Sequence, residues 1–174
     1  MGIQESSGWQ RFFGNAAQTC AECGYAWAVT LDDADTAVMS MPRAVAALTG
    51  HPRARRKPAP AVWSPAAYAW HTADAIRIWA ERFAAIAAQP DAMVEPFDQN
   101  RLADARGYES MPAAGAAWAV ERAVVDWAES VQRVDPPTRF AHRDYGAMSV
   151  ADAVRYIGHE AHHHAWDIAN GLGG

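Results

Sequence analysis

The chain has few cysteines, a single lysine and no long hydrophobic run, and each shortage excludes a class of protein. Its 174 residues include only two cysteines, too few for the disulfide framework of a small secreted domain. Lys57 is the only lysine and the net charge is −5, so the basic face needed to bind nucleic acid is missing. No stretch reaches the roughly 18 to 20 apolar residues of a membrane span. We therefore expect neither nucleic acid nor a membrane as a partner.

The start of the chain and its length point to a single cytoplasmic domain. Residues 1–13 lack the basic segment followed by an apolar segment that marks a secretory signal. A chain of 174 residues that is 51% hydrophobic is long enough to bury a core without staples. We predict one domain over residues 1–174, with an irregular arm at 1–31 and a core at about 33–170.

Helix start and stop signals divide the core into four helical segments. Ser64 followed by Pro65 is a typical helix start, and Ser149 with Asp152 predicts a capping box. The expected helices cover about 33–48, 64–88, 112–134 and 149–170. No segment shows the alternation of a half-buried strand. The sequence therefore predicts an all-α four-helix bundle, with an unusually long connection at 89–110 that we expect to be functional.

Apolar residues recur with helical spacing on these segments. The stripes comprise Tyr68, Ala75, Trp79, Phe83 and Ile86 on the second helix, and Val150, Val154, Ile157, Ala161 and Ile168 on the fourth. His71 lies at the edge of the first stripe, and we expect it to point into the bundle or along its rim. On the third helix, Trp118 and Val125 mark the apolar side, and we expect Trp70, Trp79, Trp118 and Trp127 to lie in the core.

The last helix carries four of the seven histidines within six positions. His159 and His163 are four residues apart, which places them about 40° apart around a helix axis. Such a pair can bind one zinc ion, although it lies opposite the aliphatic stripe, where solvated histidines are usual. The letters around Glu160 also match the metalloprotease motif H-E-x-x-H, but the third ligand that those enzymes take downstream is missing.

Cys20 and Cys23 leave three interpretations open. The first is that they are reduced thiols without a role. The second is that they form a redox pair or a disulfide. The third is that they are half of a metal site completed by a histidine such as His51 or His142.

A resemblance to a known family rests on three segments. These are Trp63-Ser64-Pro65 leading to His71, Gly146-Ala147-Met148-Ser149, and the run from His159 to His164 that continues to Asp167-Ile168. The pattern resembles the DinB-like metal-binding proteins, nearest their actinobacterial branch and the mycothiol-dependent maleylpyruvate isomerases. The resemblance implies a bundle of up-down-down-up topology and a homodimer. It also implies one divalent metal held by His71, His159 and His163. Zinc is the first choice, with nickel, iron and manganese as alternatives.

The resemblance favours a metal-dependent S-transferase or isomerase that uses a low-molecular-weight thiol such as mycothiol and attacks a small electrophile. Arg101 or Arg106 in the long connection would then bind carboxylates of the thiol or substrate. Glu160, Tyr156 and Asp152 are candidates for the proton carrier or for partners of the metal ligands. A non-catalytic metal-binding or scaffold protein is the alternative, and a metallohydrolase of the H-E-x-x-H type is a third.

Overall fold

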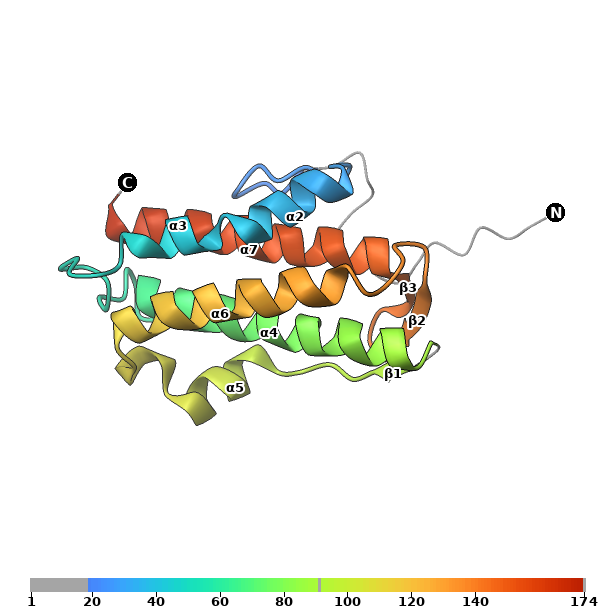
Figure 1. Ribbon diagram of the computed structural model, residues 1–174. Helices are drawn as coiled ribbons and strands as arrows, with labels where there is room; N and C mark the ends of the chain where they lie inside the picture. Colours follow the sequence, from blue (N-terminus) through green and yellow to red (C-terminus); the bar gives the residue numbers. More distant parts are fainter. Residues whose placement is uncertain (1–18, 91, 174) are drawn as a thin grey trace.

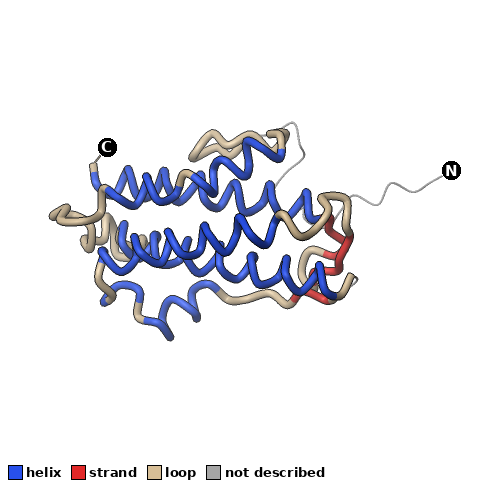
Figure 2. Tube along the Cα trace, viewed as in Figure 1, coloured by secondary structure: helices blue, strands red, loops and turns tan. Residues whose placement is uncertain are grey.

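The computed structural model describes residues 19–90 and 92–173, and within them it is mostly helical (Figures 1 and 2). The helices are α2 (Leu31–Met39), α3 (Met41–Ala46), α4 (Pro65–Ala88), α5 (Gln99–Arg106), the 3₁₀ turn η1 (Tyr108–Ser110), α6 (Ala113–Val131) and α7 (Val150–Leu172). The strands are β1 (Met93–Val94), β2 (Arg139–His142) and β3 (Gly146–Ser149). No helix in the described part of the chain is long and apolar enough to cross a membrane.

The long helices form a bundle in which α2 and α3 together take the place of the first helix. In Figure 1, α4 and α6 run in one direction, whereas α2–α3 and α7 run in the other. Helix α4 packs against α6 and α7, and α2 packs against α7. The predicted all-α bundle is confirmed, with the up-down-down-up order of its helices.

The parallel course of α4 and α6 explains the long connection between them. A helix of 24 residues rises about 36 Å, so the chain must return over that length before α6 begins. Residues 92–112 make this return along α4, and they contain β1, α5 and η1. The connection is therefore ordered by local structure that its polar sequence did not indicate.

Helix ends agree with the sequence where caps are strong. Ser64 caps α4 and the Ser149–Asp152 capping box begins α7, both as predicted. The expected helix at 33–48 is wrong in one respect: it is divided at Ser40, because Pro42 has no N–H to continue the hydrogen-bond ladder. Helix α7 also passes through Gly171 and ends at Leu172, where the following Gly173 caps the helix with a φ of 92°.

Strands are the main element that the sequence did not predict. β1 pairs with β2 in parallel, and β2 pairs with β3 antiparallel. Strands of two and four residues are too short to show a pattern of alternation. The small sheet closes the end of the bundle at which α7 begins (Figure 1).

The core contains the predicted stripe of α7, all of whose aliphatic members are buried. Trp70, Trp79 and Trp127 are buried as expected. The prediction for the third helix is wrong, because Trp118 is 65% exposed and Val125 is 45% exposed. Helix α6 instead buries Ala116, Val120, Ala123, Val124 and Trp127.

The described part of the arm, residues 19–30, is a tight turn that covers one face of α7. Thr19 and Ala26 form a β-bridge, and the N–H of Cys20 donates to the carbonyl of Tyr25. The Tyr25 hydroxyl donates to the carbonyl of Arg155 on α7, and the Arg155 guanidinium donates to the carbonyl of Val29. The remainder of the predicted arm, residues 1–18, lies outside the described residues.

Candidate metal centre and adjoining pocket

Helix α7 carries two interleaved pairs of potential metal ligands. His159 and His163 are one pair, and Glu160 and His164 are the other, each with a spacing of four residues. Successive residues on an α-helix are rotated by about 100°, so the two pairs face different neighbours. One pair faces α4 and the other faces the arm.

Glu160 and His164 meet His71, which projects from α4. The Glu160 Oε2 atom lies 3.8 Å from Nε2 of His71 and 3.5 Å from Nε2 of His164. One ligand atom from each of the three residues lies within 4.8 Å of the others. Two imidazoles and a carboxylate at these separations are a donor set typical of a three-ligand zinc site.

Three of the four ring nitrogens of this cluster are buried and lack hydrogen-bond partners among the described residues. Among the described residues, neither ring nitrogen of His71 has a partner, and the same is true of Nε2 of His164. Buried polar atoms are normally satisfied, and leaving them unpaired is unfavourable. A divalent cation bound to the three side chains would remove this deficit for the coordinating nitrogens, so these residues fit the metal that the resemblance implies.

Hydrogen bonding and burial set the charges of the cluster. Burial lowers the pKa of His71, which favours the neutral imidazole that binds metals. Burial also opposes ionisation of Glu160, but its interactions with His164 and His71 outweigh burial and hold the pKa of the carboxyl below its usual range. Burial opposes a charged His164, but the hydrogen bond to Asp167 and the nearby carboxylate of Glu160 outweigh it and raise the pKa to about 9.

His159 and His163 lie in a second cluster, with Cys20 and Cys23 of the arm. One potential ligand atom of each lies within 4.8 Å of the other three. The predicted triad of His71, His159 and His163 is therefore divided between the two clusters. His162 lies outside both, on an exposed position where its ring contacts the carbonyl of Cys23 at 3.1 Å.

The two cysteines are free thiols that lie side by side with histidines other than those predicted. His51 lies in the loop after α3, and His142 lies at the end of β2, so neither belongs to the cysteine cluster. Burial raises the pKa of the Cys23 thiol to about 11. A raised pKa is the reverse of what a reactive cysteine needs, and this argues against the redox interpretation.

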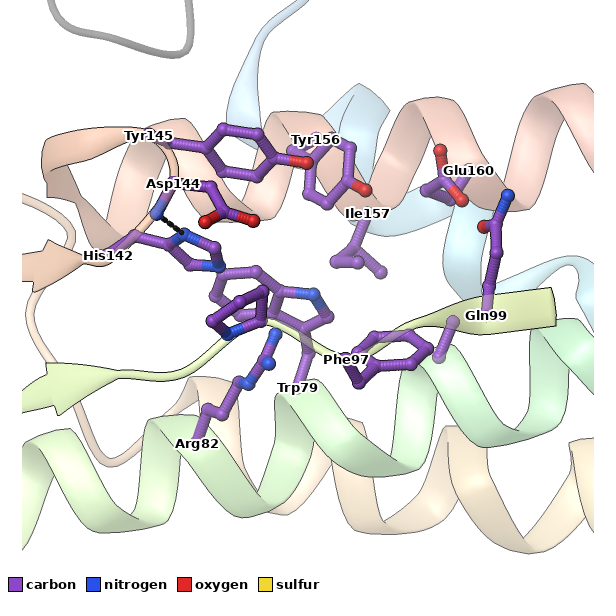
Figure 3. A pocket seen from close by; sticks show the side chains of 12 residues that line it. Trp79, Arg82, Phe97, Gln99, His142, Asp144, Tyr145, Tyr156, Ile157 and Glu160 are labelled. Carbon is purple, nitrogen blue, oxygen red and sulfur yellow. Dashed lines mark hydrogen bonds between the residues drawn. The ribbon is translucent and has the colours of Figure 1, made fainter. Parts of the chain in front are cut away.

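A pocket of about 320 Å³ adjoins the cluster of His71, Glu160 and His164. Its lining includes Ala75, Trp79, Arg82, Pro96, Phe97, Gln99, His142, Asp144, Tyr145, Tyr156, Ile157 and Glu160. Figure 3 shows Glu160 at one end of this group and His142 and Arg82 toward the other. The pocket therefore joins a candidate metal ligand to polar groups contributed by α4, the long connection and the sheet.

The pocket contains one arginine and one histidine among its polar side chains. The Arg82 guanidinium lies over the rings of Trp79 and Phe97, at 4.7 Å and 5.5 Å from their centroids. Nδ1 of His142 accepts a hydrogen bond from the N–H of Asp144 at 3.2 Å, and burial lowers the pKa of His142. A neutral His142 that accepts at Nδ1 carries its proton on Nε2 and is thus a hydrogen-bond donor.

The arginines predicted to bind carboxylates lie elsewhere. Arg101 is exposed on α5, and Arg106 forms an ion pair with the buried Asp74. Neither lines the pocket, where Arg82 stands instead.

Two of the three candidate proton carriers line the pocket. Glu160 and Tyr156 belong to its wall. Burial raises the pKa of Tyr156 well above its usual value, so its phenol stays protonated at neutral pH. Asp152 instead accepts a hydrogen bond from the N–H of Ser149 at 2.9 Å, and its place in the capping box explains its presence.

The sequence did not single out His164 and Arg82, which the structure brings into the candidate cluster and its pocket. His164 could have been found from the second i, i+4 pair, Glu160 and His164, had a carboxylate been weighed as a ligand. No sequence pattern around Arg82 indicates that it lines a pocket. The opposite wall of that pocket is formed by the long connection, whose sequence has no strong periodicity.

The comparisons with known proteins agree with this architecture. The chain is similar in structure to YfiT from Bacillus subtilis, described as a probable metal-dependent hydrolase with an unusual four-helix bundle topology. The TM-score is 0.66 at 14% identity, and the match covers 80% of this chain and 86% of that one. No curated protein shows significant sequence similarity to the chain. The family profile described as DinB superfamily matches residues 27–168, and the chain therefore belongs to the DinB superfamily.

Proposed function

We propose that the protein is a metal-dependent enzyme whose single open metal site is formed by His71, Glu160 and His164. The observation that carries the proposal is the convergence of unpartnered, buried ring nitrogens and a carboxylate at the end of a pocket. Three protein ligands leave a coordination position open, which is the arrangement of catalytic rather than structural zinc.

The chain's own residues would hold and orient these ligands. Oδ2 of Asp167 lies 2.8 Å from Nδ1 of His164. The carboxylate would accept a hydrogen bond from the Nδ1–H group, which leaves Nε2 free to coordinate the metal. Partners of this kind fix the tautomer and the orientation of a ligating imidazole. When bound, a divalent metal would supply Lewis acidity that lowers the pKa of a small molecule beside it.

We further propose that the reaction is transfer of a low-molecular-weight thiol, such as mycothiol, to a small electrophile with a carboxylate. Arg82 would bind the carboxylate through charge-assisted hydrogen bonds, and Trp79 and Phe97 would exclude water beside it. In the addition to an activated double bond, the thiol sulfur forms a bond to one carbon. The thiol proton ends on the neighbouring carbon, with Tyr156 in place to donate or relay it. This addition of a thiol across a double bond needs no oxidant or reductant.

The test uses full-length protein without a histidine tag, loaded with one metal at a time. Thiol consumption is followed with a panel of unsaturated carboxylates, for the wild type and for His71→Ala, Glu160→Gln and His164→Ala. We expect turnover in the wild type, and losses of at least a hundredfold in the three variants together with loss of the metal that binds at His71, Glu160 and His164. His162→Ala is the matched control, because His162 lies on the same helix outside both clusters. No turnover by metal-loaded protein across the panel would remove the transferase.

Hydrolysis is a second candidate because the structurally similar YfiT is described as a probable metal-dependent hydrolase. Product formation without added thiol would favour hydrolysis over transfer. A peptidase of the H-E-x-x-H type is less well supported, since Glu160 clusters with His71 and His164 rather than with His159 and His163.

A scaffold role and a homodimer remain the other proposals. A metal-bound protein without activity toward thiols or esters would favour the scaffold role. For the dimer, the exposed side chains of Trp118 and Val125 on α6 offer an apolar contact surface. Sedimentation of the wild type and of Trp118→Glu would test it.

A further inference from the structure

We propose that Cys20, Cys23, His159 and His163 form a second metal site, which binds zinc and fastens the arm to α7. Cysteines three apart and histidines four apart have the C-x₂-C and H-x₃-H spacings of structural zinc sites. The two pairs are separated by 135 residues of sequence, yet the fold brings their donor atoms within 4.8 Å of one another.

One contact between potential ligand atoms has the length expected for tetrahedral coordination. The Cys20 Sγ atom lies 3.6 Å from Nδ1 of His163. Zinc–sulfur and zinc–nitrogen bonds at a tetrahedral angle separate those two atoms by about 3.6 Å. The ligand atoms of all four residues lie within 4.8 Å of one another.

The surroundings of the two histidines also resemble those of metal ligands. The other ring nitrogen of His163, Nε2, lies 3.3 Å from the Glu22 carboxylate, which is the contact that orients a ligating imidazole. Both ring nitrogens of His159 are buried without a hydrogen-bond partner among the described residues. The rings of Trp27 and Tyr25 lie 4.5 Å and 5.4 Å from that imidazole and keep water from it.

The turn that carries the cysteines is built to present both sulfurs to one side. The N–H of Gly24 donates to the carbonyl of Cys20 at 2.9 Å, and Gly24 has a φ of 75°. Only glycine adopts that conformation without strain, so the residue after Cys23 lets the chain reverse immediately. The bridge between Thr19 and Ala26 closes the same turn.

The two clusters differ in the chemistry that they offer. The four ligands of the cysteine cluster complete a tetrahedron and leave no open position, which is typical of a structural site. The cluster of His71, Glu160 and His164 has three ligands and faces the pocket. The second site therefore stands independently of the proposed function, and its role is to hold residues 19–30 against α7.

The experiment is titration of metal-free, reduced, full-length protein with Co²⁺, which reports sulfur ligands through an intense near-ultraviolet charge-transfer band. We expect the band to saturate at one sulfur-ligated cobalt per chain. Cys20→Ser/Cys23→Ser should lose the band and still bind one cobalt through the other cluster. His71→Ala should keep the band, as should the control His51→Ala, because His51 lies in the loop after α3 and belongs to neither cluster. A correctly folded wild type that binds cobalt without the band would overturn the proposal.

Thiol reactivity of the wild type gives a second measurement that needs no variant. Zinc should slow the reaction of both thiols with a disulfide reagent at least about tenfold, because bound thiolates are withdrawn from reaction. Limited proteolysis should cut within residues 19–30 faster once zinc is removed. Equal thiol reactivity with and without zinc, or spontaneous formation of a Cys20–Cys23 disulfide in the presence of zinc, would contradict the site.

Discussion

His163 and His164 are adjacent in the sequence, but their rings lie 5.7 Å apart with planes at 89° and belong to different clusters. A single step along the helix turns a side chain by about 100°. His163 thus faces the cysteines of the arm, whereas His164 faces His71 on α4. One helix can in this way supply two pairs of ligands to two sites of different donor chemistry.

Asp167 should control the affinity of the open site through His164. Asp167→Asn weakens the hydrogen bond that orients the His164 ring, and loss of such a partner lowers metal affinity by roughly 10- to 100-fold. Zinc affinity is measured by competition with a chromophoric chelator. The Cys20→Ser/Cys23→Ser background is used, so that only one cluster binds. Asp126→Asn, in an exposed ion pair of α6, is the control, and equal affinities in both variants would show that Asp167 does not orient the ligand.

Arg82 should be the residue that binds an anionic substrate. Arg82→Gln removes a guanidinium from the pocket, and a hydrogen bond to a charged group contributes about 1.5 to 3 kcal/mol. We expect the affinity for small dicarboxylates to fall by roughly 10- to 100-fold, with metal content unchanged. Calorimetric titration measures it. Arg101→Gln, on the exposed face of α5, is the matched control, and a larger effect there would restore the sequence-based prediction.

Much of the bundle could be predicted because its helices begin and end at strong local signals. Ser64–Pro65 and Ser149–Asp152 set the starts of α4 and α7 through backbone hydrogen bonds that involve near neighbours. The short strands could not be predicted, since they are stabilised by pairing between residues 93 and 141 rather than by a local pattern.

The candidate site was predicted only in part, for a related reason. His71 and the ligand-rich helix were identified from the sequence, but the rotation of α7 about its own axis decides which i, i+4 pair faces α4. That rotation is set by packing of the aliphatic stripe around Ile157 and Ala161, which are buried. The position of Cys20 and Cys23 beside His163 depends on contacts across more than 130 residues, and no local pattern encodes them.

Tyr108 should stabilise the fold through the buried Asp74. Its hydroxyl donates to the Asp74 carboxylate, which has an exposed fraction of 2% and also pairs with Arg106. Tyr108→Phe keeps the ring but leaves a carboxylate oxygen with one donor fewer, so the free energy of unfolding should fall by about 1 to 3 kcal/mol. Urea denaturation measures the change, and an unchanged midpoint would show that water replaces the hydroxyl.

His142 should make stability depend on pH below neutrality. Burial lowers its pKa in the folded state, so between the lowered value and about 6.5 the unfolded chain binds more protons than the folded chain. Stability therefore falls as the pH falls through this window. His142→Gln should remove up to about 1.4 kcal/mol per pH unit of that slope. Subtracting the free energy of unfolding of the variant from that of the wild type cancels the contribution of the other histidines. If urea denaturation from pH 7 to pH 5 gave the same pH dependence for both proteins, the prediction would be contradicted.

Gly158 should tolerate no side chain, although glycine is normally unfavourable inside a helix. A Cβ atom there would lie 2.8 Å from both the carbonyl oxygen of Ala34 and the hydroxyl of Tyr25. Replacement by alanine gains about 1 kcal/mol of helix propensity, but overpacking of this kind typically costs about 1 to 3 kcal/mol. The backbone of α2 cannot move as a side chain can, so we expect Gly158→Ala to lower the free energy of unfolding. It should also speed cleavage of the arm by displacing Tyr25. A variant more stable than the wild type by the full propensity gain would show that α2 and α7 are less closely packed than the structure indicates.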